Sequence, residues 1–230
     1  MIIKPWRLYN CILILIGYFP PSFSFSSEPE IYPQIVEIEP GYFQFGDLVI
    51  DRKNREFVLP ALCNQTYGLI EYALVHENGK VHESLFRTSV SPRLIHACLL
   101  LLKESPQTDF FKNLQANQPN FSTLRTIEVF ADWENNGSTF SEDLSALVIC
   151  QKNDRLLRKN SFVFTGSRLI EGIYLAEEDG SIVAVYHDNR ATINSLDEES
   201  NLDDVWLANE GKMPPKEFPV SIRFRLPSKK

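Results

Sequence analysis

The sequence predicts an α+β fold in which a mixed, mostly antiparallel β-sheet has one buried Leu-rich helix, at about residues 92–103, packed on one face. Short apolar runs that end at polar or Gly-containing turns recur along the chain, which is typical of strands. One segment, "VSPRLIHACLLLLKES", combines a helix-start signal with a long apolar surface. The composition, 43% hydrophobic and 23% charged residues over 230 positions, indicates an ordinary globular chain with one sizeable core.

Residues 1–26 have the organisation of a secretory signal peptide. Lys4 and Arg7 precede the apolar run "LYNCILILIGYF" (8–19), and "PPSFSFSS" then ends this run with helix breakers and small residues. The run is shorter than the roughly 20 residues that a membrane-spanning helix needs, so an uncleaved N-terminal anchor is the less favoured alternative. We therefore expect an exported protein, periplasmic or extracellular, with no membrane span after signal cleavage.

The net charge argues against nucleic acid as a partner. The whole chain carries a formal charge of -7, and loss of the leader removes two basic residues and no acidic one, which lowers the charge to -9. Phosphate binding needs a basic face, and the mature sequence has no Lys/Arg cluster outside the short tail Lys229-Lys230. The expected partner is therefore an unknown envelope protein or a small ligand.

The mature chain begins with residues 27–44, which are rich in Pro and Glu and predict an extended lead-in segment. A single domain is expected over residues 45–228. Its first part, "DLVIDRKNREFVLPAL" (47–62), indicates two strands around the polar turn 52–55.

The strongest local signal is "GLIEYALVHENGKVHESLF" (68–86), in which two apolar runs meet at Asn78-Gly79. This dipeptide tolerates the positive φ angles of a type I′ hairpin. The hairpin register places Glu83 on the more apolar face and His82 on the opposite face, and a slip of one residue would exchange the faces. A carboxylate in apolar surroundings is either a structural hydrogen-bond acceptor or an acid with a raised pKa that suits proton transfer.

The helix follows directly. Ser91 is a good N-cap, and Pro92 suits the first helical position. His96 falls on the least apolar edge of the helix near its N-terminus, where the helix dipole disfavours the protonated ring and leaves a neutral acceptor or ligand. Little of the helix surface is polar, and the predicted buried face consists of Leu94, Ile95, Cys98, Leu101 and Leu102.

The second half alternates loops and strands. Residues 104–122 are polar and rich in Asn and Gln, and predict an insertion loop. A strand over 123–134 should end at the turn Asn136-Gly137. In "YLAEEDGSIVAVYHD" (174–188), the turn 178–181 should join two further strands.

Histidines and carboxylates give a few weak candidates for chemistry. The segment "YHDN" places His187 and Asp188 at a strand end, where they are most often turn and capping residues. Zinc or iron is held by two histidines and a carboxylate in some proteins, but no HxH or HExxH motif occurs here, so no cofactor is predicted. The residues with the right atoms are His82, His96 and His187, with Glu83 or Asp188 as the carboxylate.

The cysteines do not form a recognisable framework. Signal cleavage removes Cys11 and leaves Cys63, Cys98 and Cys150, which are widely spaced without a CxxC pair. Each has apolar neighbours, so buried free thiols are expected, and one disulfide with a leftover thiol is the alternative.

Several segments together resemble a known family. They are "LPALCNQTYGLIEYALVHENGKVHESLF", "SPRLIHACLLLL", "FVFTGSRLIEGIYLAEEDGSIVAVYHDNRATIN" and "VWLANEG". These are similar to the YdjY-like domain of bacterial exported and envelope proteins, in which a Gly-Lys-x-His-Glu-Ser-Leu hairpin precedes a Leu-rich helix carrying a histidine.

The resemblance implies an exported domain of unassigned biochemical role. It places Lys80, His82, Glu83, Ser84 and His96 at the positions of the family's signature. Some proteins with such a domain are described as ferredoxin-like with iron-sulfur cysteines. The three dispersed mature cysteines of this chain cannot supply the usual four thiolates, so no iron-sulfur cluster is expected.

Two classes of function fit these residues. The favoured one is a non-catalytic binding or interaction module of the envelope. The alternative is a metal-assisted or acid/base enzyme that uses a cluster of His82, Glu83 and His96, with Asp188 as a further candidate. An enzyme requires these side chains to converge at a solvent-reachable pocket, whereas a module does not.

Overall fold

The computed structural model describes residues 32–115 and 123–228. The predicted signal peptide, residues 1–26, and the first part of the lead-in segment lie outside the described residues. Within the described part of the chain, no helix combines the length and the apolar character needed to cross a bilayer.

The α+β prediction is wrong, because the described chain is mainly β, with 41% strand and 19% helix, and its sheet closes into an eight-stranded barrel. Six of the pairs around the ring are antiparallel, and two, β5–β6 and β14–β15, are parallel. The ring consists, in spatial order, of β4 (Glu56–Cys63), β17 (Pro219–Arg225), β7 (Thr126–Asn135), β11 (Phe162–Phe164), β15 (Ile193–Ser195), β14 (Ser181–Ala184), β5 (Tyr72–His76) and β6 (Ser84–Thr88).

Every second side chain along the longest strands faces inward, and these side chains build the core. Phe57 of β4 pairs with Phe224 of β17, which pairs with Val129 of β7, and all three are fully buried. The two rings stack with centroids 4.5 Å apart. Side chains in this row face the core, while the intervening positions are more exposed, as expected for a sheet with one buried face.

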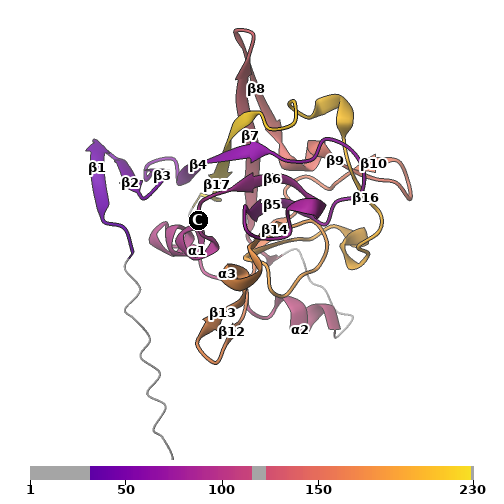
Figure 1. Ribbon diagram of the computed structural model, residues 1–230. Helices are drawn as coiled ribbons and strands as arrows, with labels where there is room; N and C mark the ends of the chain where they lie inside the picture. Colours follow the sequence, from indigo (N-terminus) through magenta and orange to yellow (C-terminus); the bar gives the residue numbers. More distant parts are fainter. Residues whose placement is uncertain (1–31, 116–122, 229–230) are drawn as a thin grey trace, which may run out of the picture. The chain divides into compact units, whose positions relative to one another are not determined.

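Other strands extend the barrel or lie beside it (Figure 1). The predicted lead-in segment contributes β1, which pairs with β2, and the two strands expected over 47–62 are β3 and β4. The hairpin β7–β8 turns at Asn136-Gly137, as predicted. These additional strands are β1 (Ile35–Glu39), β2 (Tyr42–Phe45), β3 (Leu48–Asp51), β8 (Ser138–Asp143), β9 (Val148–Cys150), β10 (Arg155–Leu156), β12 (Leu169–Ile170), β13 (Ile173–Tyr174) and β16 (Trp206–Ala208).

The described helices are short. They are α1 (Pro92–Leu101), α2 (Phe110–Gln115) and α3 (Leu175–Asp179), with 3-10 turns at Val81–Glu83, Leu144–Leu147, Glu198–Asn201 and Glu210–Lys212. Helix α2 lies within the stretch predicted as the insertion loop, of which residues 116–122 lie outside the described part. Helix α3 ends at Gly180 where a turn between two strands was predicted, and only β14 follows as expected.

Helix α1 begins as predicted, because Ser91 accepts a hydrogen bond from the Leu94 amide and Pro92 is the first helical residue. Its buried face includes fewer of the predicted residues than expected. Ile95 and Cys98 enter the same core as the barrel strands, but the exposed fraction of Leu101 is 48%. The apolar run therefore includes a surface strip in addition to a core face.

The predicted hairpin at Asn78-Gly79 is wrong. Strands β5 and β6 run parallel, with Tyr72 opposite Ser84, and the chain returns through the 3-10 turn Val81–Glu83. Neither Asn78 nor Gly79 has a positive φ angle. Gly79 is needed for close packing instead, because a Cβ atom there would lie 2.7 Å from the Asp179 carbonyl oxygen.

Cys63, Cys98 and Cys150 are buried free thiols, as favoured from the sequence. Burial raises the pKa of the Cys63 thiol to about 11, so this group stays protonated at neutral pH.

Candidate functional site

His82 and Glu83 lie in the KVHES segment, residues 80–84, and contact each other. The 3-10 turn brings His82 Nε2 to 3.1 Å from Glu83 Oε1, whereas the predicted strand placed the two side chains on opposite faces. The side chain of His82 is 74% exposed and that of Glu83 is 34% exposed. The predicted burial of Glu83 on an apolar face is therefore wrong.

Glu71 is the partner of Glu83 that the sequence did not reveal. The Glu71 amide donates to the Glu83 carbonyl at 2.8 Å, so the two residues lie side by side just before the parallel strands β5 and β6. Partial burial raises the pKa of the Glu71 carboxyl to about 7, and the neighbouring Glu83 charge adds to this effect while Lys80 opposes it. The antiparallel register expected from Asn78-Gly79 does not place Glu71 beside Glu83, so this pair could not be expected from the sequence.

Asp188 belongs to a buried hydrogen-bonded network that anchors the KVHES segment. The Tyr72 hydroxyl donates to Asp188 Oδ2 at 2.9 Å, and Lys80 Nζ lies 2.5 Å from the Tyr72 hydroxyl and 3.7 Å from Asp188. The Arg190 amide donates to the other carboxylate oxygen at 2.9 Å. Since Asp188 is only 6% exposed and well bonded, its arrangement is that of a structural anchor.

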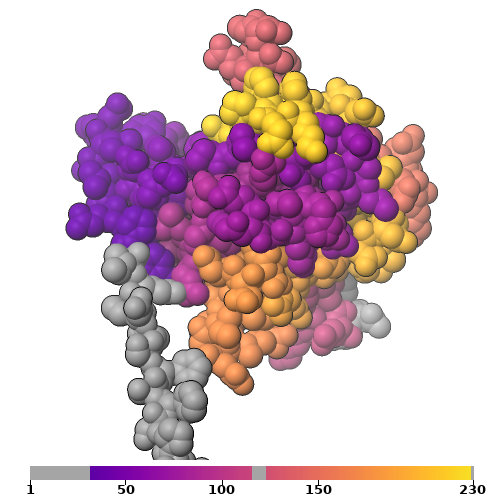
Figure 2. All heavy atoms as spheres, viewed as in Figure 1, coloured from indigo at the N-terminus to yellow at the C-terminus, as the bar shows by residue number. Residues whose placement is uncertain are grey.

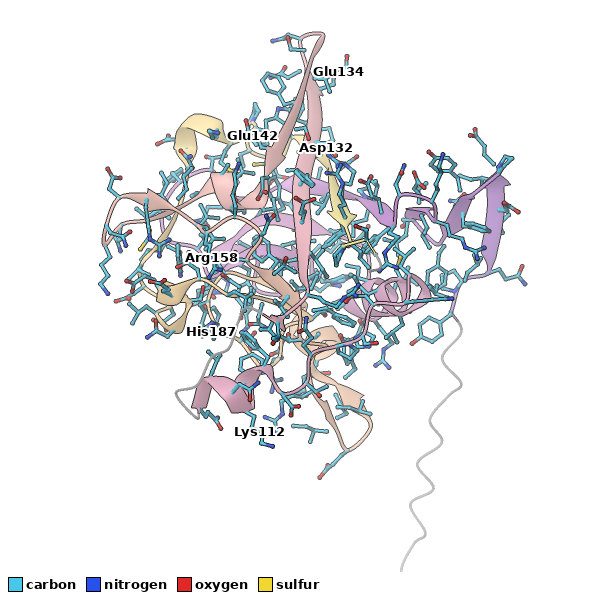
Figure 3. All side chains as sticks on the ribbon, turned by 180° about the vertical axis from the view of Figure 1, so that it is seen from behind. Lys112, Asp132, Glu134, Glu142, Arg158 and His187 are labelled. Carbon is cyan, nitrogen blue, oxygen red and sulfur yellow. The ribbon has the colours of Figure 1, made fainter. Side chains whose placement is uncertain are left out.

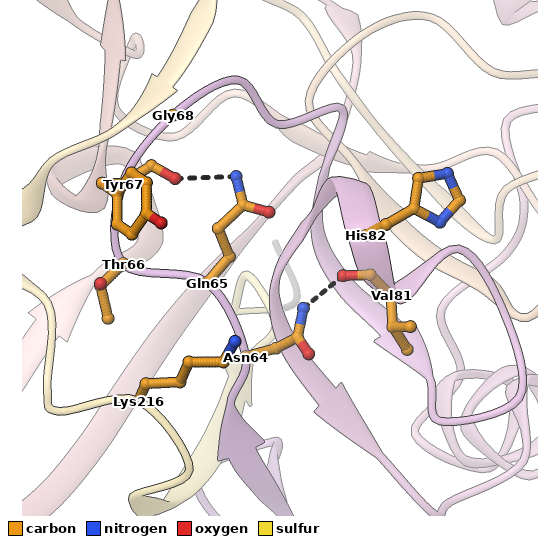
Figure 4. A pocket seen from close by; sticks show the side chains of 8 residues that line it. All are labelled: Asn64, Gln65, Thr66, Tyr67, Gly68, Val81, His82 and Lys216. Atoms are coloured by element: carbon orange, nitrogen blue, oxygen red, sulfur yellow. Dashed lines mark hydrogen bonds between the residues drawn. The ribbon is translucent and has the colours of Figure 1, made fainter.

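A polar cavity of about 470 Å³ lies beside His82 (Figure 4). Asn64 and Gln65 line it, but both amides are used to hold the local backbone. Asn64 donates to the Val81 carbonyl, and Gln65 donates to the carbonyls of Tyr67 and Leu69. Two of the polar side chains that line this cavity are thus already used to stabilise the fold.

His96 lines a different cavity, of about 340 Å³, formed by α1, the β12–β13 hairpin and Tyr32. We refer to it as the His96 cavity. Its walls and rim include Ala97, Leu100 and Leu169, and the exposed fractions of the two leucines are 47% and 70%. Apolar side chains that remain this exposed beside a hollow are typical of ligand-binding sites.

The His96 ring is held in one orientation. Its Nδ1 lies 2.9 Å from the Tyr174 hydroxyl, which lies 3.0 Å from Thr192 Oγ1, and its edge packs on Phe164. Burial, with a smaller contribution from the Arg93 charge, lowers the pKa of His96 below its ordinary value. The ring is therefore neutral at pH 7, as predicted from its place in the helix, although burial is the main physical cause.

His187 has a structural environment of its own. Its Nε2 lies 3.1 Å from the Ser195 carbonyl oxygen, and its ring meets Phe110 of α2 at a centroid distance of 5.5 Å. Figure 3 shows it next to α2, which carries Lys112. Burial lowers its pKa.

The predicted candidates do not form one cluster. His82 and Glu83 are together, His96 lines another cavity, and Asp188 and His187 lie in separate bonded networks. Within residues 32–115 and 123–228, no three His, Cys, Asp or Glu side chains are grouped so that they could hold a metal ion.

Sequence reasoning missed most of the His96 cavity. Tyr174 and Leu169 come from the segment "SRLIEGIY" (167–174), which entered the sequence analysis only as part of the family resemblance. A usable signal was present, because Leu169, Ile170 and Ile173 flank the short polar turn Glu171-Gly172. In the structure all three of these aliphatic residues are exposed.

The comparisons with known proteins add one match. The family model for the YdjY domain matches residues 48–225, which covers well over half of the chain. No curated protein and no solved structure matches this sequence. The chain therefore belongs to the YdjY domain family, as its KVHES segment and histidine-bearing helix indicated.

Proposed function

We propose that this protein is an exported, non-catalytic domain of the bacterial envelope that binds the apolar part of a small ligand in the His96 cavity. The observation that carries this proposal is the combination of apolar walls, an exposed apolar rim and one oriented neutral histidine in the same hollow. A concave apolar site with a few placed polar groups is the usual form of a small-molecule site.

The rim supplies the driving force for binding. Leu100 and Leu169 expose apolar surface that a ligand would remove from water, and each methylene group buried contributes about 0.8 kcal/mol. The cavity accepts this material without rearrangement of the core, because Ile95 and Cys98 of α1 already pack on the other side of the helix.

His96 supplies orientation. Its Nδ1 is engaged with Tyr174, and within the described residues Nε2 has no protein partner, which leaves it to bond a polar atom of the ligand. Because the ring is neutral, it does not require a counter-ion there.

Binding of an uncharged fluorophore tests this proposal. N-phenyl-1-naphthylamine brightens in apolar surroundings, and we expect saturable one-to-one binding. Leu169→Lys places a charge on the rim and should weaken binding about fivefold or more. Leu156→Lys is the matched control, since Leu156 is 45% exposed on β10 and does not line the cavity. Equal loss in both variants, or no saturable binding by the wild type, would refute the proposal.

Export is part of the proposal and rests on the leader-like residues 1–26. Expression of the full chain in a bacterium, followed by fractionation and intact mass measurement, should give a periplasmic or secreted species that lacks the leader. A full-length product retained in the cytoplasm or in membranes would contradict it.

Acid/base catalysis remains a second candidate because of the Glu71–Glu83 pair beside His82. A carboxyl group with a pKa of about 7 can exchange protons at neutral pH. It ranks second because the neighbouring polar cavity is lined by His82 and by neither carboxylate. Hydrolysis of nitrophenyl esters or glycosides that is lost in both Glu71→Gln and Glu83→Gln would move it ahead.

A further inference from the structure

We infer that the ligand of the His96 cavity is an amphiphile with an anionic head, which Arg168 binds where a second cavity adjoins the first. This inference rests on the proposed function and adds the chemical class of the ligand.

The two cavities have Ser167 as a common wall. The second, which we call the Arg168 cavity, has a volume of about 440 Å³ and is lined by Arg168, Thr108 and Asn189 among others. The shared wall is firmly held, because the Ser167 hydroxyl donates to the Arg190 carbonyl at 2.6 Å and accepts from the Ala176 amide at 3.0 Å. An apolar hollow therefore lies next to a polar one across a fixed boundary.

No described residue pairs with the positive charge at this boundary. Arg168 is exposed, and its guanidinium has no hydrogen bond or ion pair with the described residues. The arginines Arg125 and Arg190 differ, because each is paired with a carboxylate, Glu104 and Asp179 respectively. In a chain with a net charge of -7, an unpaired arginine in a cavity that adjoins an apolar one favours an anionic group of the ligand.

None of the described carboxylates near Arg168 pairs with it in place of such a ligand. Asp179 is bonded to Arg190, and Glu177 accepts from the Ser91 hydroxyl and from the Arg93 amide. Glu171 lies at the tip of the β12–β13 hairpin, and within the described residues its side chain has no hydrogen bond or ion pair. Among the described residues, therefore, no carboxylate pairs with Arg168, and an external anion can take the position beside it.

The hairpin provides the surface for the apolar chain of the ligand. Glu171 and Gly172 both have positive φ angles, which form the tight turn that pairs Ile170 with Ile173 and Leu169 with Tyr174. Leu169 and Tyr174 line the His96 cavity, and the hairpin, orange in Figure 2, stands out from this face of the molecule. An alkyl chain seated between Leu169 and Leu100 brings its head group toward Ser167 and Arg168.

Competition between two twelve-carbon ligands tests the inference. Dodecanoate and dodecan-1-ol share the alkyl chain and differ in head-group charge, and each can displace N-phenyl-1-naphthylamine at monomeric concentrations at pH 8. We expect dodecanoate to bind about fivefold more tightly than the alcohol at low salt and to lose this preference at high salt. Arg168→Gln should abolish the preference without changing binding of the alcohol.

Arg52→Gln is the matched control, because Arg52 is an exposed arginine that lines neither cavity. Equal affinity of the wild type for both ligands, or a preference that survives Arg168→Gln, would overturn the inference while leaving the proposed function intact. Failure of the fluorophore and both ligands to bind would instead refute the proposed function. An Arg168-dependent affinity for phosphatidylglycerol vesicles, without binding of dodecanoate, would identify the anionic amphiphile as a lipid in a bilayer.

Discussion

The two histidines that accompany the family resemblance occupy opposite kinds of environment. His82 is 74% exposed in a 3-10 turn and contacts its neighbour Glu83. His96 is half-buried, its Nδ1 is held by Tyr174, and it lines an apolar cavity. Both lie close to apolar runs in the sequence, so sequence neighbours alone do not decide which histidine is available for a ligand. The comparison instead shows that distant residues, Tyr174 and Thr192 in particular, make His96 a defined site.

The largest effect is expected at the anchor of the His82 region. Asp188→Ala removes a buried carboxylate that accepts from Tyr72 and faces Lys80, and should lower the free energy of unfolding by about 3 to 5 kcal/mol. Urea unfolding measures this loss. Asp204→Ala, at an exposed aspartate, is the control and should change stability by less than about 0.5 kcal/mol. A small effect of Asp188→Ala would mean that the network does not hold the KVHES segment.

An intermediate effect is expected on the His96 side. Tyr174→Phe removes the hydroxyl that is bonded to both His96 and Thr192 and should cost about 1 to 3 kcal/mol. His82→Ala should cost less than about 0.5 kcal/mol, because its side chain is mostly exposed. Thermal unfolding of the two variants compares the environments directly. A larger loss of stability for His82→Ala would mean that the surroundings of His82, and not those of His96, are the more firmly held.

A smaller, pH-dependent effect is expected at Glu71. Its pKa is about 7 in the folded protein and 4.5 in the unfolded chain, so between these values the folded state binds more protons and stability falls as pH rises. Glu71→Gln should reduce this fall by on the order of 1 kcal/mol, since solvent screens a partly exposed pair. Unfolding at pH 5 and pH 8 measures it, with the exposed Glu134→Gln as control. An unchanged pH dependence would show that folding does not raise the pKa of Glu71.

Two Asn-Gly dipeptides show how far the fold could be predicted. At Asn136-Gly137 both residues have positive φ angles, and β7 and β8 form the expected hairpin. The strand after this turn, β8, is largely exposed, so its pairing with the neighbouring β7 is enough to form it and no distant strand is needed. After Asn78-Gly79, the strand β6 is buried and pairs with β5 on one side and β4 on the other, which closes the barrel. Such long-range pairing leaves no local signal in the sequence.

The candidate site was predictable in part. The helix cap at Ser91 follows from a local rule and agrees with the structure. The neutral state of His96 was expected from its place in the helix, but its main cause is burial, which that rule does not include. The cavity itself depends on Leu169 and Tyr174, more than 70 residues further along the chain. Leu101 illustrates the same limit, because apolar periodicity placed it in the core although nothing in the described chain covers it fully.

The most direct test of the account is an NMR titration of the four histidine rings with dodecanoate. Long-range proton–nitrogen spectra report each imidazole separately, so His82 and His96 serve as mutual references in one sample. Binding in the His96 cavity predicts saturable shifts of the His96 ring signals, with those of His82 and His187 unchanged. Shifts at His82 with none at His96 would contradict the account and transfer the ligand site to the KVHES segment.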